Sequence, residues 1–162
     1  MRHILTGALT ALILASSGAS AAETLAVFPV KLLDTSNEAR DQRADHASRQ
    51  TMMAEILAEG LPGEKTMIAP ETVAQVCPQA TPDCLFGVAR DAGADQALFV
   101  SLQKASSLII TMYVSIVELD DGALVKYGDL SFRGDTDQSW QRAAEYVVKE
   151  MAAGAFDRAT PK

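Results

Sequence analysis

Three consecutive strand patterns occupy the second half of the chain. Residues 96–104 alternate between two faces, and residues 108–119 are rich in β-branched side chains; both patterns are typical of strands. Asp121-Gly122 follows as a hairpin turn signal, and residues 123–132 return as a third strand. Because strands joined by short connections pair in antiparallel fashion, this region predicts an antiparallel three-stranded meander.

In the first half of the chain, strand signals alternate with helix signals. Residues 24–30 are a continuous apolar run, as in a strand buried on both faces. A polar stretch covers residues 31 to about 45, and a helix then ends near Gly60. Residues 66–69 form a second short strand, and residues 71–76 suffice for a turn or two of helix. The longer helix is indicated by apolar residues at helical spacing, namely Met52, Met53, Ile56 and Leu57.

Two later helices have clear starting signals. Thr81 is placed to cap a helix that has Pro82 at its first position, where proline is favoured. The last helix spans about residues 137–152, with Asp135 or Thr136 as its cap. Its apolar residues recur along one face, which is the pattern of an amphipathic helix packed on a core.

These elements follow the order β-α-β-(α)-α-β-β-β-α. Strands separated by helices favour parallel pairing, while the last three strands favour antiparallel pairing. The fold class predicted is an α/β (α+β) sandwich, with a mixed five-stranded sheet packed by about three helices. Residues 22–162 contain no repeat or linker, so we expect one domain, with a frayed tail after about residue 154.

The first 21 residues have the pattern of a secretory signal peptide. Arg2 and His3 give a positive start, residues 4–14 are largely apolar, and Ala19-Ser20-Ala21 fits the cleavage pattern. An uncleaved membrane anchor is the alternative, but this apolar run is too short to cross ~30 Å of hydrocarbon. No cysteine lies near the cleavage point. The sequence therefore predicts a periplasmic protein that is not lipid-anchored and has no stable membrane insertion after cleavage.

Cys77 and Cys84 are the two cysteines of the chain, and Pro78 and Pro82 bend the segment around them. In an oxidising compartment such a pair most simply forms a disulfide. A thioredoxin-like motif requires C-x-x-C, and a structural zinc site usually requires four Cys or His ligands. We therefore predict a structural disulfide.

Composition excludes several classes of protein. The chain is 48% hydrophobic and 22% charged, which is ordinary for a globular domain and not for a disordered one. The formal net charge is −7, which argues against nucleic acid as a partner, since nucleic-acid binding needs clustered Lys and Arg. An acidic surface steers a protein towards basic patches on its partners.

The order of motifs resembles a known group of cell-envelope domains. The features are an opening strand that ends in Phe28-Pro29, a Cys pair before a helix, and Ala92-Gly93-Ala94-Asp95 leading into a strand. The long strand, the Asp-Gly hairpin and the final helix complete the pattern. It is similar to the N-terminal domain of the Tol periplasmic protein (TolB) and to the curli-secretion (CsgG-like) domain. It looks closest to a bacterial periplasmic family catalogued as a domain of unknown function.

This resemblance implies a non-enzymatic interaction or assembly-accessory module of the cell envelope, with no cofactor. The implied partners are envelope or periplasmic proteins, among them a quinoprotein dehydrogenase system. Curli-secretion proteins are lipid-anchored and build a pore from long insertions, and this chain has neither a leader cysteine nor an insertion. The resemblance therefore does not extend to pore formation.

A ligand or partner site is expected at the carboxyl ends of the parallel strands, where open α/β sheets bind. The alternative function is a small-ligand or metal-binding periplasmic protein that uses the loop after the first strand. These side chains also suit a simpler role, which is to hydrogen-bond the loop backbone. The candidates are Asp34, Thr35, Ser36, Asn37, Glu71, Ser106 and Ser107.

Catalytic motifs are absent from the sequence. The mature chain has a single histidine, His46, and neither G-x-S-x-G nor G-x-G-x-x-G occurs. Asp41, Asp45 and His46, with Asn37, are candidate ligands for a metal ion, and the alternative is a solvated polar loop with capping carboxylates. We predict no catalytic residue, and we expect an outer strand of the sheet to offer an edge for pairing with a partner strand.

Overall fold

The structure is a computed structural model that describes residues 23–157. The predicted signal peptide, residues 1–21, lies outside the described residues. The strands are β1 (Thr24–Val27), β2 (Lys31–Asp34), β3 (Glu64–Met67), β4 (Gln96–Ser106), β5 (Ile109–Glu118) and β6 (Leu124–Phe132). The helices are α1 (Arg43–Gly60), α2 (Pro70–Val76), α3 (Pro82–Asp91) and α4 (Asp137–Ala152). No helix within residues 23–157 is both long and apolar enough to span a membrane.

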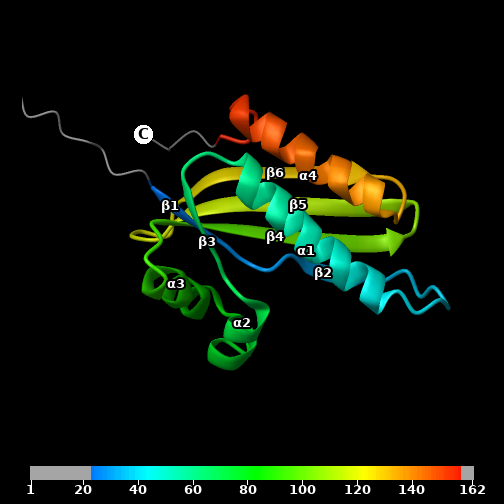
Figure 1. Ribbon diagram of the computed structural model, residues 1–162, viewed down its shortest axis with the longest axis horizontal. Coiled ribbons are helices and arrows are strands. Elements are labelled where there is room, and N and C mark those ends of the chain that lie inside the picture. Colours follow the sequence, from blue (N-terminus) through cyan, green and yellow to red (C-terminus); the bar gives the residue numbers. More distant parts are fainter. Residues whose placement is uncertain (1–22, 158–162) are drawn as a thin grey trace, which may run out of the picture.

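The sheet is mixed and has the order β3-β1-β4-β5-β6, with β2 also paired to β4 (Figure 1). The pairs among β1, β2, β3 and β4 are parallel, and β4, β5 and β6 form the antiparallel meander. The predicted α/β sandwich with a mixed sheet is confirmed. The sheet has six strands instead of five, because residues 31–34 form β2 along β4 instead of starting a polar loop. Pro29, which has no backbone N–H to donate, lies between β1 and β2.

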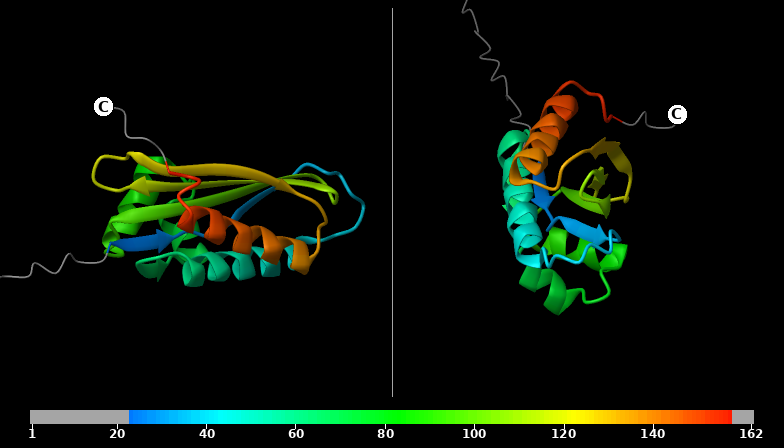
Figure 2. Two further views of the ribbon diagram at one scale, coloured as in Figure 1. Left: turned by 90° about the horizontal axis from the view of Figure 1, so that it is seen from above. Right: turned by 90° about the vertical axis from the view of Figure 1, so that its right-hand side faces the viewer.

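Helices cover both faces of the sheet. Figure 2 shows α1 and α4 side by side along one face, with α2 and α3 on the other. The larger core lies under α1 and α4 and includes Leu57, Leu102 and Trp140. The smaller core joins α2 and α3 to β1 and the start of β4, and includes Phe28 and Ala97. Because α2 and α3 cover only that part of their face, the outer faces of β5 and β6 are left partly open.

Local signals place several elements as predicted. Thr136 caps α4, and its side chain accepts a hydrogen bond from the Ser139 backbone N–H at 3.3 Å. Gly122 has φ +74° in the turn between β5 and β6, a conformation that glycine adopts without strain.

The helix α1 begins at Arg43, well before the apolar residues that predicted it. The chain also does not fray directly after Gly154.

Residues 155–157 return along β6. The carbonyl oxygen of Phe156 accepts a hydrogen bond from the Tyr127 N–H at 2.9 Å, and Lys126 forms an ion pair with Asp157. A Cβ atom on Gly128 would lie 2.4 Å from the Phe156 ring. Glycine at this position therefore lets the ring lie against the strand.

Candidate functional site

Six of the seven predicted edge residues come together at one end of the sheet. β2 ends at Asp34 and β4 ends at Ser106, and these two strands run parallel with Asp34 opposite Lys104. The loop after β2 meets the end of β4, where the Ser107 N–H donates to Glu38 Oε1 at 2.7 Å. The seventh residue, Glu71, belongs to α2, which lies well away from this loop (Figure 1).

The side chains of the loop after β2 hydrogen-bond its own backbone. The Thr35 N–H and hydroxyl both donate to the Lys104 carbonyl oxygen, at 2.8 and 3.0 Å. Asp34 Oδ1 accepts from the Ser36 N–H at 2.9 Å, and the Asn37 amide donates to the Thr35 carbonyl oxygen at 3.2 Å. These bonds hold the loop in a fixed shape, and a role for the loop as a binding edge stays a prediction.

A buried lysine that sequence reasoning missed lies at the centre of this region. Lys104 is 0% exposed, and its Nζ lies 2.8 Å from Asp135 Oδ2, 3.0 Å from Glu38 Oε2 and 3.4 Å from Asp34 Oδ2. Gln42 Oε1 accepts a further hydrogen bond at 3.2 Å. Such a buried ammonium is tolerable only when carboxylates surround it, because burying an unpaired charge is very costly.

Asp135 connects this lysine to the helices. Its side chain is 2% exposed and accepts hydrogen bonds from Arg49 Nη1 at 2.8 Å and from Trp140 Nε1 at 3.0 Å. His46 Nε2 lies 2.8 Å from Asp135 Oδ2. The charge cluster, defined as Asp34, Glu38, His46, Arg49, Lys104 and Asp135, therefore joins β2, α1, β4 and the start of α4.

The solvated-loop interpretation of His46 is wrong, because this residue is 5% exposed and lies within α1. Its predicted companions have other partners: Asp41 pairs with Arg43 at 2.7 Å, and Asp45 pairs with Arg40 at 2.9 Å. Within residues 23–157, no three or more His, Cys, Asp or Glu side chains are grouped to hold a metal ion. The structure therefore does not bring the three metal candidates together.

The hydrogen bonds and ion pairs of the charge cluster keep Asp135, Glu38 and Lys104 ionised. Burial alone raises the pKa of Asp135, but hydrogen bonds from His46, Lys104 and Trp140 outweigh it and lower that pKa to about 2. The hydrogen bond from Lys104 and the Ser107 N–H lower the pKa of Glu38 to about 2. Burial lowers the pKa of Lys104, but its carboxylate partners, Asp135 first, raise it above its usual value. A general acid or base works best with a pKa near the operating pH, and these groups are shifted away from neutrality.

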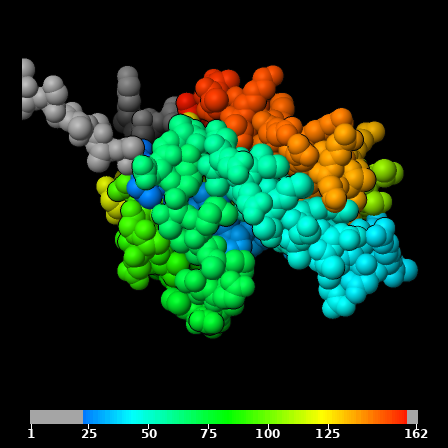
Figure 3. Space-filling model, in the orientation of Figure 1, coloured from blue at the N-terminus to red at the C-terminus, as the bar shows by residue number. Residues whose placement is uncertain are grey.

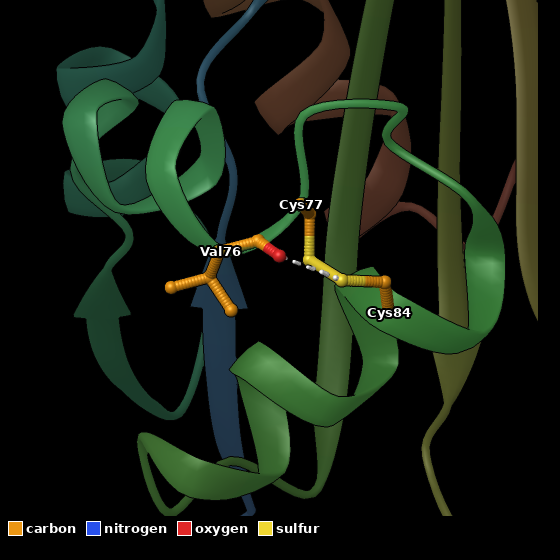
Figure 4. Close-up of a disulfide and its surroundings, with 3 residues drawn as sticks. All are labelled: Val76, Cys77 and Cys84. Atoms are coloured by element: carbon orange, nitrogen blue, oxygen red, sulfur yellow. Dashed lines mark hydrogen bonds between the residues drawn. A yellow bond between two sulfur atoms is a disulfide. The ribbon is translucent and has the colours of Figure 1, made fainter.

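The disulfide lies on the opposite face of the sheet. Cys77 and Cys84 are joined with a Cα–Cα distance of 5.8 Å, and Cys84 Sγ lies 3.4 Å from the Val76 carbonyl oxygen (Figure 4). The bond connects the end of α2 to the first turn of α3. Cys77 is buried in the smaller core, so the disulfide fixes α2 against the sheet.

The surface is hollowed between α2 and α1, where the segment after β1 forms the floor (Figure 3). This cavity has a volume of about 330 Å³ and is lined by Pro29, Ala54 and Met67, among others. Glu55 also lines it, and Gln50 in its wall donates to the Val30 carbonyl oxygen at 2.7 Å. Its lining is therefore mixed, with a carboxylate at one side.

The outer edge of the sheet at β6 is open along part of its length. The Tyr127 N–H points away from β5, since it donates to Phe156. From Lys126 to Phe132 the pairing of β6 with β5 is regular, and backbone groups of a strand alternate in direction. The N–H and C=O groups of Asp129 and Ser131 therefore also point outward, and among residues 23–157 they have no backbone partner.

Comparison with solved structures shows several similar folds. A Helicobacter pylori protein described as a homolog of neuraminyllactose-binding hemagglutinin has a TM-score of 0.50 at 9% identity, over 80% of this chain and 86% of that one. The LpoB C-terminal domain from Salmonella enterica has a TM-score of 0.46 at 15% identity, over 72% of this chain and 87% of that one. TolB from Acinetobacter baumannii has a TM-score of 0.47 at 10% identity, over 83% of this chain and 28% of that one.

These likenesses concern the fold alone. The predicted similarity to TolB is thus found in part, while the resemblance to the curli-secretion domain stays a prediction. No curated protein sequence matches the chain. A family model does match it, and the match extends over residues 23–151, which include every strand and almost all of α4. The chain therefore belongs to the family DUF3280, described as a protein of unknown function (DUF2380).

Proposed function

We propose that this chain is a non-enzymatic periplasmic interaction module, which pairs an extended segment of another envelope protein with the outer edge of β6. The observation that carries the proposal is the row of outward backbone groups at Asp129 and Ser131. Unpaired N–H and C=O groups on an edge strand are a template for a further strand.

The edge of β6 carries charges of both signs, since the exposed side chains of Arg133 and Arg142 line the same hollow as Ser131. Residues 155–157 pair with β6 near Tyr127, so an added strand has room only beyond that point. Asp129 is exposed there, and the chain has a net charge of −7.

Two further observations support a non-catalytic protein of the periplasm. The carboxylates of the charge cluster have lowered pKa values, and that of Lys104 is raised, so their role is to hold the loop after β2 to α1 and α4. The leader pattern and the disulfide both suit an oxidising compartment outside the cytoplasm. Neither the fold nor the comparisons support a quinoprotein dehydrogenase as the partner, and the proposal does not include it.

Site-specific photo-crosslinking tests the proposal. A photoreactive amino acid at Asp129 should crosslink a defined protein in the native periplasm, whereas the same group at Asp91, exposed at the end of α3, should not. Ser131→Pro removes the outward N–H without removing a bond to β5, so it should abolish the crosslink.

Ser131→Ala is the matched control. Like Ser131→Pro, this variant loses the contact between the Ser131 and Thr111 hydroxyls, which lie 3.0 Å apart. Because it keeps the backbone N–H of residue 131, it should crosslink like the wild type. Equal crosslinking from Asp129 and Asp91, or an unchanged yield in folded Ser131→Pro protein, would show that β6 is not the binding edge.

A further inference from the structure

We infer that the chain also holds a small-molecule site, a pocket that takes an amphipathic anion with an apolar body and one carboxylate or similar group. The pocket lies between α2 and the partly open face of β4, β5 and β6, and its volume is about 350 Å³. We call it the aromatic pocket. It reaches Tyr127 of β6 but lies on the face of the sheet, not along the backbone edge that the proposed partner strand would use, and this inference goes beyond the proposed function.

Aromatic rings form much of the aromatic pocket. Phe28 and Phe99 stack with their ring centroids 4.7 Å apart, and both line the pocket together with Tyr113 and Tyr127. Ser115 is opposite Phe99 on one side and Tyr127 on the other, so these three side chains share one face of the sheet. Such a surface suits an apolar ligand body, because small-molecule sites are mostly apolar clefts with a few polar groups.

The wall opposite the sheet is fixed covalently. Val73 and Cys77, from α2 and its end, line the aromatic pocket, and the disulfide to Cys84 connects this segment to α3. A site that is held in shape before binding loses less conformational entropy when it is filled. The disulfide therefore has a role in keeping this pocket open as well as in stability.

The charge at the aromatic pocket is opposite to that of the whole protein. Although the chain has a net charge of −7, the pocket lining contains no Asp or Glu, and its one charged residue is Lys31. Lys31 is opposite Ser101 across β2 and β4, and Ser101 is opposite Tyr113 across β4 and β5. These three side chains thus share one row on one face.

Lys31 is not among the ion pairs formed within residues 23–157. Lys31 is exposed and lines this apolar cavity, with two hydroxyl groups in the same row. An anionic head group placed there gains a charge-assisted hydrogen bond, while a cationic one is repelled. The volume is at the small end of the range of ligand sites, about 300–1,000 Å³, and therefore favours a short-chain amphiphile.

Calorimetric titration with three eight-carbon probes tests this inference on the full mature protein. Octanoate should bind more tightly than 1-octanol, and octyltrimethylammonium should not bind. Lys31→Gln should weaken octanoate binding about threefold, the size expected for one partly exposed ion pair, and should leave 1-octanol unchanged. Lys149→Gln removes an exposed charge from the end of α4 and should change the affinity of neither octanoate nor 1-octanol.

A second variant tests the location independently of charge. Ser115→Trp places a large ring between Phe99 and Tyr127 and should abolish octanoate binding, with circular dichroism and thermal unfolding used to establish that the variant is folded. Absence of octanoate binding to the wild type overturns the inference, as does unchanged binding to folded Ser115→Trp protein. Equal affinity for octanoate and 1-octanol also overturns it, since this result is expected of a pocket for a partner's apolar side chain.

Discussion

Replacement of Asp135 by Asn removes the carboxylate that connects the buried lysine to the helices. In the wild type, Asp135 pairs with Lys104 at 2.8 Å and with Arg49 at 2.8 Å, and its side chain is 2% exposed. The amide keeps the size of the side chain but leaves the Lys104 ammonium with less compensating charge in a fully buried position. Breaking a buried ion pair by removing one partner costs about 3–5 kcal/mol.

The pH dependence follows from the lowered pKa of Asp135. The pKa is about 2 in the folded protein against 3.8 for an unperturbed aspartate side chain, so the folded state binds fewer protons than the unfolded state between these values. The resulting stability, about 2 kcal/mol, is present above pH 4 and is lost as the pH falls towards 2. The Asn variant lacks it at every pH.

Urea unfolding of both proteins at several pH values between 7 and 2 measures this effect. We expect Asp135→Asn to lower the free energy of unfolding by about 3–5 kcal/mol at pH 7, and the difference from the wild type to shrink by about 2 kcal/mol by pH 2. Asp137→Asn is the matched control, because Asp137 also pairs with Arg49 but is 81% exposed. Its cost should be below about 1 kcal/mol.

The reasoning is refuted if Asp135→Asn costs no more than the Asp137→Asn control at pH 7. It is also refuted if the stability difference between wild type and Asp135→Asn does not change with pH, because the lowered pKa of Asp135 is then not what stabilises the fold.

Three further substitutions test single contacts by thermal or urea unfolding. Replacing Cys77 and Cys84 together by Ala should cost about 2.5 kcal/mol through loss of the loop closure, and equal stability of reduced and oxidised wild type would contradict this. Gly60→Ala places a Cβ 2.7 Å from the Val148 side chain. The resulting overpacking should destabilise the fold by about 1–3 kcal/mol, which should exceed the stabilisation of about 1 kcal/mol from higher helix propensity. A more stable variant would argue against close packing of α1 on α4. Thr136→Ala removes the cap of α4 and should cost about 1 kcal/mol, whereas no loss would mean that the cap is dispensable.

The elements that local patterns predicted well are long and periodic. The helix α4 (Asp137–Ala152) has the predicted bounds, because its apolar residues repeat along one face over its whole length and Thr136 marks its start. The antiparallel meander was predicted for a similar reason, since β5 and β6 are long and a two-residue turn signal lies between them. In these segments, local preference and tertiary packing agree.

The strand β2 shows where local patterns fail. It has four residues, Lys31–Asp34, most of them exposed, and both of its ends are charged. Its pairing partner, β4, is some 70 residues away along the chain, so the sequence near β2 does not indicate a strand. The apolar pattern does not define the first turns of α1, because they have few apolar residues, and the charge cluster supplies part of their packing instead.

One feature of the sequence does indicate the charge cluster, which is a lysine on the apolar face of a predicted strand. Leu98, Val100 and Leu102 alternate along one buried face of β4, and Lys104 takes the next position on that face. A lysine in a buried position requires nearby carboxylates, but the sequence does not say which. Glu38 is 66 residues from Lys104 along the chain, and only the fold brings them together.

Amide hydrogen exchange measured by NMR tests the central claim, that β6 pairs with a partner strand, most directly. The crosslinked partner, once identified, is added to the isotope-labelled protein, and exchange at Asp129 and Ser131 is compared with exchange in the protein alone. These two outward N–H groups should exchange freely alone and become strongly protected in the complex, because they then donate to the added strand. If both amides exchange at the same rate with and without saturating partner, binding takes place elsewhere and the proposed function is wrong.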